Sequence, residues 1–285
     1  MSFASAALIG LGEVGQILAT DLAARGLSDI TAYDVLFADP GSKPSRSAGP
    51  ARKCASAAEA VAGKNLIFSA VTAASDLEAA RAVAGAIEPG AFFLDLNSVS
   101  PDQKQKAAAL INGAGGRYVE AAVMTPFPPK RIASPMLLGG PHAADFLKQA
   151  AGLGLSARVF STDYGKASAT KMCRSVIIKG VEALVTESLL SARHYGVEGD
   201  VLDSLSDLLP VGDWNRLAAY LIGRSLEHGK RRAEEMREVA ETVAEAGIEP
   251  LMTLACVERQ EWAARHNGLE GANLSETLDR ILEQR

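Results

Sequence analysis

Gly10-Leu11-Gly12-Glu13-Val14-Gly15 decides the fold of this chain, because it separates two segments of different character. Residues 6–9 form an apolar run that predicts a buried strand, and residues 16–23 predict a helix. Glycines at this spacing let the backbone turn tightly and approach a ligand closely, while the N–H groups of the new helix favour a pyrophosphate. The sequence therefore predicts that these six residues bind a dinucleotide.

Asp34 is the carboxylate that such a turn requires further along the chain. It ends a second apolar stretch, residues 30–33, and lies 19 positions after Gly15, close to the expected spacing of about 20. A carboxylate there accepts hydrogen bonds from a free ribose hydroxyl and repels a phosphate, which favours NAD. Lys43 and Arg46 lie on the loop just beyond, so NADP stays open as an alternative.

The composition excludes several classes of protein. The chain has 285 residues, enough for two domains, and is 48% hydrophobic and 22% charged. Its net charge of −5 provides no basic surface for nucleic acid or an anionic membrane, and no apolar run reaches the roughly 18 residues that span a bilayer. Cys54, Cys173 and Cys256 have neither the spacing of a metal site nor the even number that disulfides need. We expect a cytoplasmic protein without a signal peptide.

Strand-like and helix-like segments alternate through the first half. Strands are predicted at residues 29–33, 66–71, 91–96, 117–123, 136–138 and 158–160. Helices are predicted at residues 57–62, 76–87, 101–112 and 143–151, and residues 39–51 are predicted to form a loop. This alternation predicts parallel β–α–β units, and hence an α/β fold with a doubly wound sheet over residues 1–163.

The second half is predicted to be all-helical. Its helix-like segments are residues 166–195, 200–209, 214–224, 231–246, 251–267 and 273–283. We expect an all-α domain over residues 164–285 that binds substrate and forms a homodimer, because alanine-rich helices with apolar faces often bury them against a second copy.

One polar stripe stands out on the first of these helices. Lys171, Ser175, Lys179 and Glu182 are spaced by 4, 4 and 3 residues, which places them on one face of an otherwise apolar helix. Such a stripe indicates either a solvent-facing edge or a site, and the residues alone do not decide between them.

The chain resembles the β-hydroxyacid dehydrogenase superfamily, which includes 3-hydroxyisobutyrate and 6-phosphogluconate dehydrogenases and has an N-terminal Rossmann-type sheet. The resemblance rests on four matches in family order. They are the glycine motif, residues 95–101 (DLNSVSP), residues 118–123 with 133–140 (YVEAAV and ASPMLLGG), and Gly165 followed by Lys171-Met172-Cys173.

The resemblance implies roles for individual residues. Lys171 is expected to exchange a proton with the substrate hydroxyl, and burial or a nearby cation such as Lys179 would lower its pKa toward the working range. Val71 and Thr72 are expected along the cofactor, and Asn97 and Ser98 between cofactor and substrate. The residues predicted to bind the substrate are Ser98, Thr125, Ser175, His228 and Arg231.

Several positions depart from the family pattern. Ser175 stands where the family usually has asparagine, and Ile178 where 6-phosphogluconate dehydrogenases have glutamate. Residues 124–126 (MTP) replace the Ser-Gly-Gly that binds the substrate carboxylate, which leaves Thr125 as the polar side chain there. These departures indicate a divergent branch with a bulkier or less anionic substrate. His228 or Arg231 would supply a missing positive charge, unless their cluster is a solvated helix face.

Three functions remain open on the sequence. The leading one is an NAD(P)-dependent dehydrogenase that acts on the CH–OH group of a β-hydroxy acid or a related compound. An imine reductase is an alternative, although such enzymes usually carry aspartate or tyrosine in place of Lys171. The other alternative is a non-catalytic, dinucleotide-binding regulatory protein, which the altered residues 124–126 would suit.

Overall fold

The computed structural model describes residues 3–284, with the side chains of residues 206–208 excepted. Its internal contacts divide the chain into two compact units, Met1–Met172 and Cys173–Arg285. The division falls inside helix α8 (Lys166–Tyr195), so the first turns of that helix belong to the first unit. No helix in the described range has the length and apolar character to cross a membrane.

The first unit is built on an eight-stranded sheet in the order β3-β2-β1-β4-β5-β6-β7-β8. The strands are β1 (Ser5–Ile9), β2 (Asp29–Tyr33), β3 (Arg52–Lys53), β4 (Leu66–Ser69), β5 (Phe92–Asp95), β6 (Arg117–Val123), β7 (Met136–Gly139) and β8 (Ala157–Ser161). The predicted doubly wound α/β fold is confirmed. Because β1 lies between β2 and β4, the order of the strands reverses beside the glycine turn, where such sheets bind ligands.

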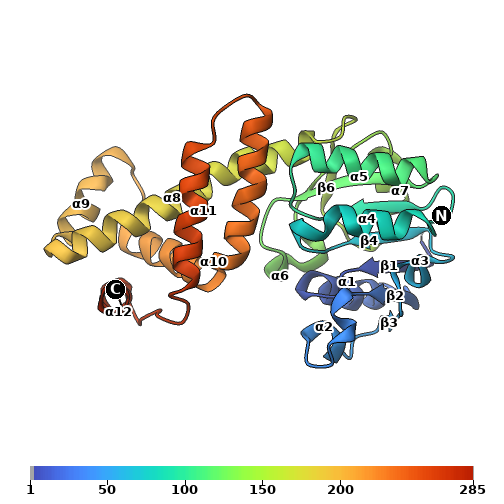
Figure 1. Ribbon diagram of the computed structural model, residues 1–285, viewed down its shortest axis with the longest axis horizontal. Coiled ribbons are helices and arrows are strands. Elements are labelled where there is room, and N and C mark those ends of the chain that lie inside the picture. The colour runs from blue at the N-terminus through green and yellow to red at the C-terminus, as the bar shows by residue number, and fades with distance from the viewer. Residues whose placement is uncertain (1–2, 285) are drawn as a thin grey trace. The chain divides into compact units, whose positions relative to one another are not determined.

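Helices cover both faces of the sheet. Helices α1 (Glu13–Ala24), α6 (Phe127–Lys130) and α7 (Ala143–Gln149) share one apolar core with the strands, and α3 (Ala57–Val61), α4 (Asp76–Ala84) and α5 (Pro101–Gly113) share another. Figure 1 shows α4 and α5 side by side along the sheet. Short turns connect these elements, namely η1 (Val35–Ala38), α2 (Lys43–Arg46), η2 (Ala73–Ser75), η3 (Arg131–Ala133) and η4 (Ala151–Leu153).

Strand β7 departs from the all-parallel prediction. It runs antiparallel to β6, with Glu120 opposite Gly139. The connection between the two strands contains only the single turns α6 and η3. A parallel crossover usually runs through a full helix, and the prolines at 128 and 129 disfavour one here.

The segment predicted as a loop, residues 39–51, contains one turn of helix. Ser42 caps the single turn α2 by accepting a hydrogen bond from the N–H of Ser45 at 3.1 Å. The short strand β3, which directly follows the predicted loop, was also not predicted. Both elements are too short to produce a periodic pattern of apolar residues.

The second unit consists of the rest of α8 with α9 (Glu198–Leu208), α10 (Trp214–Glu245), α11 (Leu251–Ala264) and α12 (Leu274–Glu283). Its core includes Trp214, Ile222, Leu278 and Ile281. The prediction of two helices at residues 214–224 and 231–246 is wrong, because α10 is continuous. Gly229 does not interrupt it: a Cβ atom there would lie 2.5 Å from the backbone oxygen of Gln260, so this glycine allows α10 and α11 to approach closely.

Candidate active site

The glycine turn between β1 and α1 has a shape that glycine alone permits. Gly10 has φ of 93°, and a Cβ atom on it would lie 2.3 Å from the backbone oxygen of Ala70. A Cβ atom on Gly15 would lie 2.1 Å from the backbone oxygen of Gly10. By contrast, no heavy atom of the described chain lies within 4 Å of a Cβ built on Gly12. This open space, at the N-terminus of a 12-residue helix, fits the pyrophosphate of a dinucleotide.

Asp34 is fixed beside this turn. Its Oδ2 atom accepts a hydrogen bond from the N–H of Leu11 at 2.7 Å, and its Oδ1 atom accepts one from the N–H of Leu36 at 2.9 Å. The carboxylate therefore links the glycine turn to the end of β2. A ribose that follows the pyrophosphate along this edge would meet an acceptor already held in place.

Asn97 joins the ends of β4 and β5. Its Oδ1 atom accepts a hydrogen bond from the N–H of Val71 at 2.8 Å. Its Nδ2 atom donates to Ser69 Oγ at 2.9 Å and to Asp76 Oδ1 at 2.7 Å. Asn97 thus holds Val71 at the edge where the cofactor was predicted to pass, while Thr72 is exposed beside it.

Lys171 lies next to the same edge. Its Nζ atom donates a hydrogen bond to the Oγ atom of Ser98, the neighbour of Asn97. Both side chains are partly buried, so the ammonium group is not free in solvent.

A buried glutamate anchors the start of the helix that carries Lys171. Glu120 on β6 accepts hydrogen bonds from the N–H of Gly165 at 2.6 Å and from the N–H of Ser168 at 2.5 Å. Burial raises the pKa of Glu120, against the opposing effects of Lys104 and of these two hydrogen bonds. Since the first N–H groups of a helix lack partners within it, Glu120 fixes the first turn of α8, which belongs to the first unit, on the sheet.

Asp95 is the centre of a buried polar network beneath the site. Lys104 contacts its Oδ1 atom at 2.9 Å, and the Tyr118 hydroxyl donates to its Oδ2 atom at 2.5 Å. The N–H of Asn97 donates to Oδ1 at 2.8 Å. The network ties β5, β6 and α5 together below Ser98.

Thr125 follows β6 on the loop that replaces the family's anion-binding segment. Its Oγ1 atom is enclosed and has no hydrogen-bond partner within the described residues. The N–H of Met124 is already bonded to the oxygen of Pro135 at 2.9 Å, and Pro126 has no N–H. The loop therefore offers an anion neither the N–H of residue 124 nor one at residue 126.

The polar stripe on α8 is not a solvent-facing edge in the second unit. Ser175 and Glu182 are buried, and Lys179 Nζ donates to Ser175 Oγ at 3.3 Å. Lys179 also lies 3.4 Å from Glu235, and its burial lowers its pKa. Glu182 forms a buried ion pair with Arg232 of α10.

His228 and Arg231 are the predicted substrate residues on α10. Arg231 is exposed and pairs with Glu235, and His228 Nε2 lies 3.3 Å from Glu227. The neighbouring Arg232 is the one that is buried. The sequence showed a basic cluster here, but its consecutive cations gave no signal of which one faces the core.

The structure brings one set of predicted residues together within the first unit. Asp34 contacts the glycine turn, Val71 contacts Asn97, and Lys171 contacts Ser98. Ser175, His228 and Arg231 belong to the second unit. Asp76 and Glu120 were not predicted, although a glutamate inside an apolar strand was a signal for the second.

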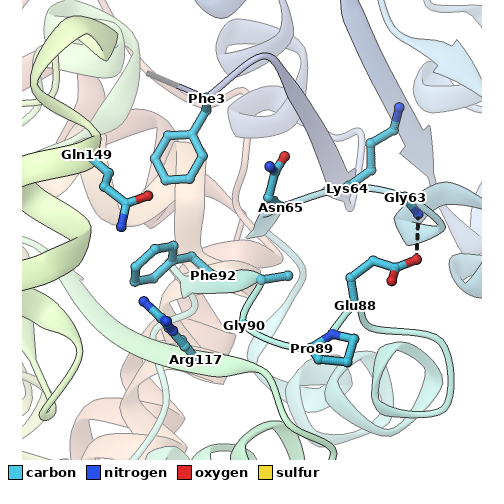
Figure 2. A pocket seen from close by; sticks show the side chains of 11 residues that line it. Phe3, Gly63, Lys64, Asn65, Glu88, Pro89, Gly90, Phe92, Arg117 and Gln149 are labelled. Carbon is cyan, nitrogen blue, oxygen red and sulfur yellow. Dashed lines mark hydrogen bonds between the residues drawn. The ribbon is translucent and has the colours of Figure 1, made fainter. Parts of the chain in front are cut away.

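The pocket in Figure 2 is not this site. It has a volume of about 620 Å³ and is lined by Phe3, Asn65, Phe92 and Arg117 among others. These residues lie at or just before the amino ends of their strands. Dinucleotides bind at the carboxyl ends of such strands, where the glycine turn and Ser98 lie.

These features are typical of a dinucleotide-binding protein. Comparison with known proteins identifies the family. Residues 5–144 match the NAD binding domain of 6-phosphogluconate dehydrogenase, and residues 192–263 match a domain of unknown function, DUF1932. A conserved hypothetical protein from Sinorhizobium meliloti is 34% identical, with a TM-score of 0.77 over 99% of this chain and 97% of its own.

Two further solved structures are similar. A conserved protein of unknown function, described as structurally similar to 3-hydroxyacid dehydrogenases, is 30% identical over 92% of this chain and 99% of its own, with a TM-score of 0.69. A 3-hydroxyisobutyrate dehydrogenase from Mycobacterium tuberculosis shares the fold, with a TM-score of 0.75, 16% identity and 99% of each chain covered. The chain belongs to the β-hydroxyacid dehydrogenase superfamily, among its 6-phosphogluconate and 3-hydroxyisobutyrate dehydrogenase-like members.

Proposed function

We propose that this protein is an NAD(P)-dependent oxidoreductase that transfers a hydride between the nicotinamide and the hydroxyl-bearing carbon of a β-hydroxy acid or a related compound. The observation that carries the proposal is the hydrogen bond from Lys171 to Ser98 at the same edge of the sheet as the glycine turn. A bound dinucleotide supplies the hydride acceptor or donor. The chain must then supply a group that moves the hydroxyl proton.

Lys171 is the residue proposed for that proton. In the oxidising direction its neutral amine takes the proton of the substrate hydroxyl, and in the reducing direction its ammonium group returns one. Ser98 orients the lysine, because its hydroxyl already accepts a hydrogen bond from Nζ. The enclosed Thr125 hydroxyl is proposed to bind a substrate oxygen.

We propose NAD as the preferred cofactor. Asp34 is held beside the glycine turn, where we propose that the adenosine ribose binds, and Val35 next to it offers no cation. The Lys53 ammonium group donates a hydrogen bond to the backbone oxygen of Ser45 on α2, so it is already bonded within the protein. Lys43 and Arg46 on α2 are the side chains that would favour NADP instead.

The substrate is proposed to be less anionic than a simple 3-hydroxy acid. The loop after β6 lacks the pair of backbone N–H groups that would surround a carboxylate, since Met124 uses its N–H internally and Pro126 has none. A neutral oxygen bound by Thr125 suits this loop better.

We also propose that the chain forms a homodimer through its helical unit. Ile177, Val181 and Leu184 are exposed at spacings of 4 and 3 along α8, and Leu251 and Met252 are exposed on α11. Exposed apolar stripes of this kind usually lie at interfaces. Light scattering on the purified chain tests this: a monomeric mass across the micromolar range would refute it.

The central experiment combines dinucleotide binding with a reaction screen. We expect NADH to quench or enhance protein fluorescence on titration, with a lower Kd than NADPH. We expect absorbance changes of the nicotinamide with at least one member of a panel of hydroxy acids, amino alcohols and cyclic imines. Turnover of imines alone would favour the imine reductase, and tight binding without turnover would favour the regulatory protein.

A further inference from the structure

The side chain of Asn97 has no hydrogen left to offer a ligand. A carboxamide has two N–H donors, and those of Asn97 are used by Ser69 Oγ and Asp76 Oδ1. Its oxygen is used by the N–H of Val71. Asn97 is 4% exposed. It therefore acts inside the protein, as the link between the end of β4 and the segment that presents Ser98.

Asp76 is the ionisable group bonded to the Asn97 side chain in this link. It is the first residue of α4 and is 2% exposed. Its Oδ1 atom accepts from Asn97 at 2.7 Å, while no amide, hydroxyl or ammonium group in the described chain donates to its Oδ2 atom. An ionised oxygen buried without a donor is strongly unfavourable, whereas the O–H of a carboxylic acid would turn that oxygen into a donor.

The surroundings of Asp76 are rich in acidic groups. The titratable groups that face it are Asp95 on β5, Lys104 on α5 and Tyr118 on β6, and Glu120 on β6 lies near Asp95 and Lys104. Lys104 is the cation of this group within the described residues, and it already pairs with Asp95 at 2.9 Å. One buried cation thus faces three buried carboxyl groups, which favours a proton shared among them.

The electrostatics agree with this arrangement. Burial raises the pKa of Asp76 to about 7, and the negative charge of Asp95 adds to the increase, while Lys104 opposes it. A hydrogen bond between the Asp76 and Asp95 carboxyl groups also favours the protonated form of Asp76. Two carboxylates have no hydrogen between them, so this bond exists only when one of them is an acid.

We propose that Asp76 is a positioning residue for the dinucleotide site: as a buried carboxylic acid it fixes the Asn97 amide, and with it the N–H of Val71 and the neighbouring Ser98. The Asp76 O–H donates to Asp95, and its other oxygen accepts from Asn97. Deprotonation places two negative charges side by side away from water, which loosens the link between β4 and β5. The dinucleotide readout of this inference rests on the proposed function.

The proton itself is tested without any cofactor. The infrared spectrum of the full chain is recorded for the wild type and for Asp76→Asn, which carries an N–H where the acid carries its O–H. We expect the wild type at about pH 6 to show the carbonyl band of a protonated carboxyl group, which disappears by about pH 8.5 and is absent from the variant. Identical spectra of the two proteins would overturn the assignment of the proton.

The positioning role is tested by NADH titration at the same two pH values. Asp76→Asn is expected to bind NADH within about threefold of the wild type at the lower pH and to lack the weakening that the wild type shows at the higher pH. Asp76→Ala leaves a donor of Asn97 unsatisfied and is expected to weaken binding about tenfold. Glu78→Gln is the control, since Glu78 lies on the same helix with its side chain 80% exposed.

Two results would overturn the positioning role: NADH affinity of Asp76→Ala equal to that of the wild type, or Asp76→Asn as weak as Asp76→Ala. If Asp76→Ala does not fold, the pH profile of Asp76→Asn decides, and a profile parallel to the wild type refutes the proposal. A wild type that binds neither NADH nor NADPH would instead refute the proposed function and the positioning role with it, while the infrared result would still decide the proton.

Discussion

The ammonium group of Lys171 donates a hydrogen bond to the hydroxyl of Ser98, across 73 positions of the sequence. The contact joins the first turns of α8 to the segment that follows β5. On one side Glu120 holds the first turn of α8, and on the other three side-chain hydrogen bonds hold Asn97, the neighbour of Ser98. The proposed proton-transfer group is thus positioned from two independent directions.

Replacing Lys171 is expected to separate binding from chemistry. Lys171→Ala should keep the NADH Kd within about threefold and reduce kcat by roughly 10²–10⁴, the usual contribution of a positioned acid or base. Lys171→Arg should be nearly as inactive, because a guanidinium keeps its proton. Steady-state kinetics against the responsive substrate measures this. The control is Lys166→Ala, at the exposed first residue of the same helix, and full activity of Lys171→Ala would refute the role.

Replacing Asp34 is expected to change cofactor preference. Asp34→Asn removes the charge and one of the two acceptors that hold Leu11 and Leu36. NADH binding should weaken about tenfold, the cost of one or two hydrogen bonds to a charged group, and NADPH binding should weaken less. Fluorescence titration of both cofactors measures the ratio. Asp39→Asn, on the exposed part of the following loop, serves as the control, and an unchanged ratio would contradict the prediction.

Two glycines of α10 are expected to respond in opposite ways to alanine. At Gly229 the new methyl group would meet the backbone of α11 at 2.5 Å, and backbone cannot move aside without separating the helices. Gly229→Ala should therefore lower the free energy of unfolding by about 1–3 kcal/mol. Gly223→Ala is the matched variant, because within the described residues no atom outside the neighbouring helix backbone lies within 4 Å of its Cβ position. It should raise that free energy by about 0.5–1 kcal/mol. Denaturant unfolding compares the two, and equal effects would contradict the close packing.

The stability of the protein should depend on pH through Asp76. Its pKa is about 7 in the folded chain, above the ordinary value of 3.8 that we take for the unfolded chain. Between these values the folded state holds a proton that the unfolded state has released, so this contribution to stability falls as pH rises and levels off above the folded pKa. The free energy of unfolding of Asp76→Asn relative to the wild type should accordingly increase from about pH 5 to about pH 8. A constant difference would contradict the raised pKa.

The sequence predicted most of the fold because its signals are local. The glycine motif has the spacing typical of a dinucleotide-binding turn. The buried strands are mostly apolar, with single polar residues at their ends. The antiparallel direction of β7 was not predicted, because it depends on the shape of the connection from β6, which contains only the single turns α6 and η3. The break predicted between residues 224 and 231 was wrong, because only the partner helix shows that Gly229 serves close packing.

The site was predictable in part for a similar reason. Residues that belong to a motif, such as Asp34 and Lys171, carry a signal in the sequence. Asp76 carries none, because an acidic residue in the first turn of a helix is ordinarily explained by the helix dipole. Its burial beside Asp95 results from the pairing of β4 with β5, which only the folded sheet reveals.

The pairing of Glu120 with Gly139 has an evolutionary consequence. A Cβ atom on Gly139 would lie 2.6 Å from Oε2 of Glu120, on the strand paired with it. A descendant that keeps the glutamate in its bonds to Gly165 and Ser168 is expected to keep glycine across from it, and one that loses the glutamate is released from that constraint. In a family tree of such chains, the two positions should change on the same branches.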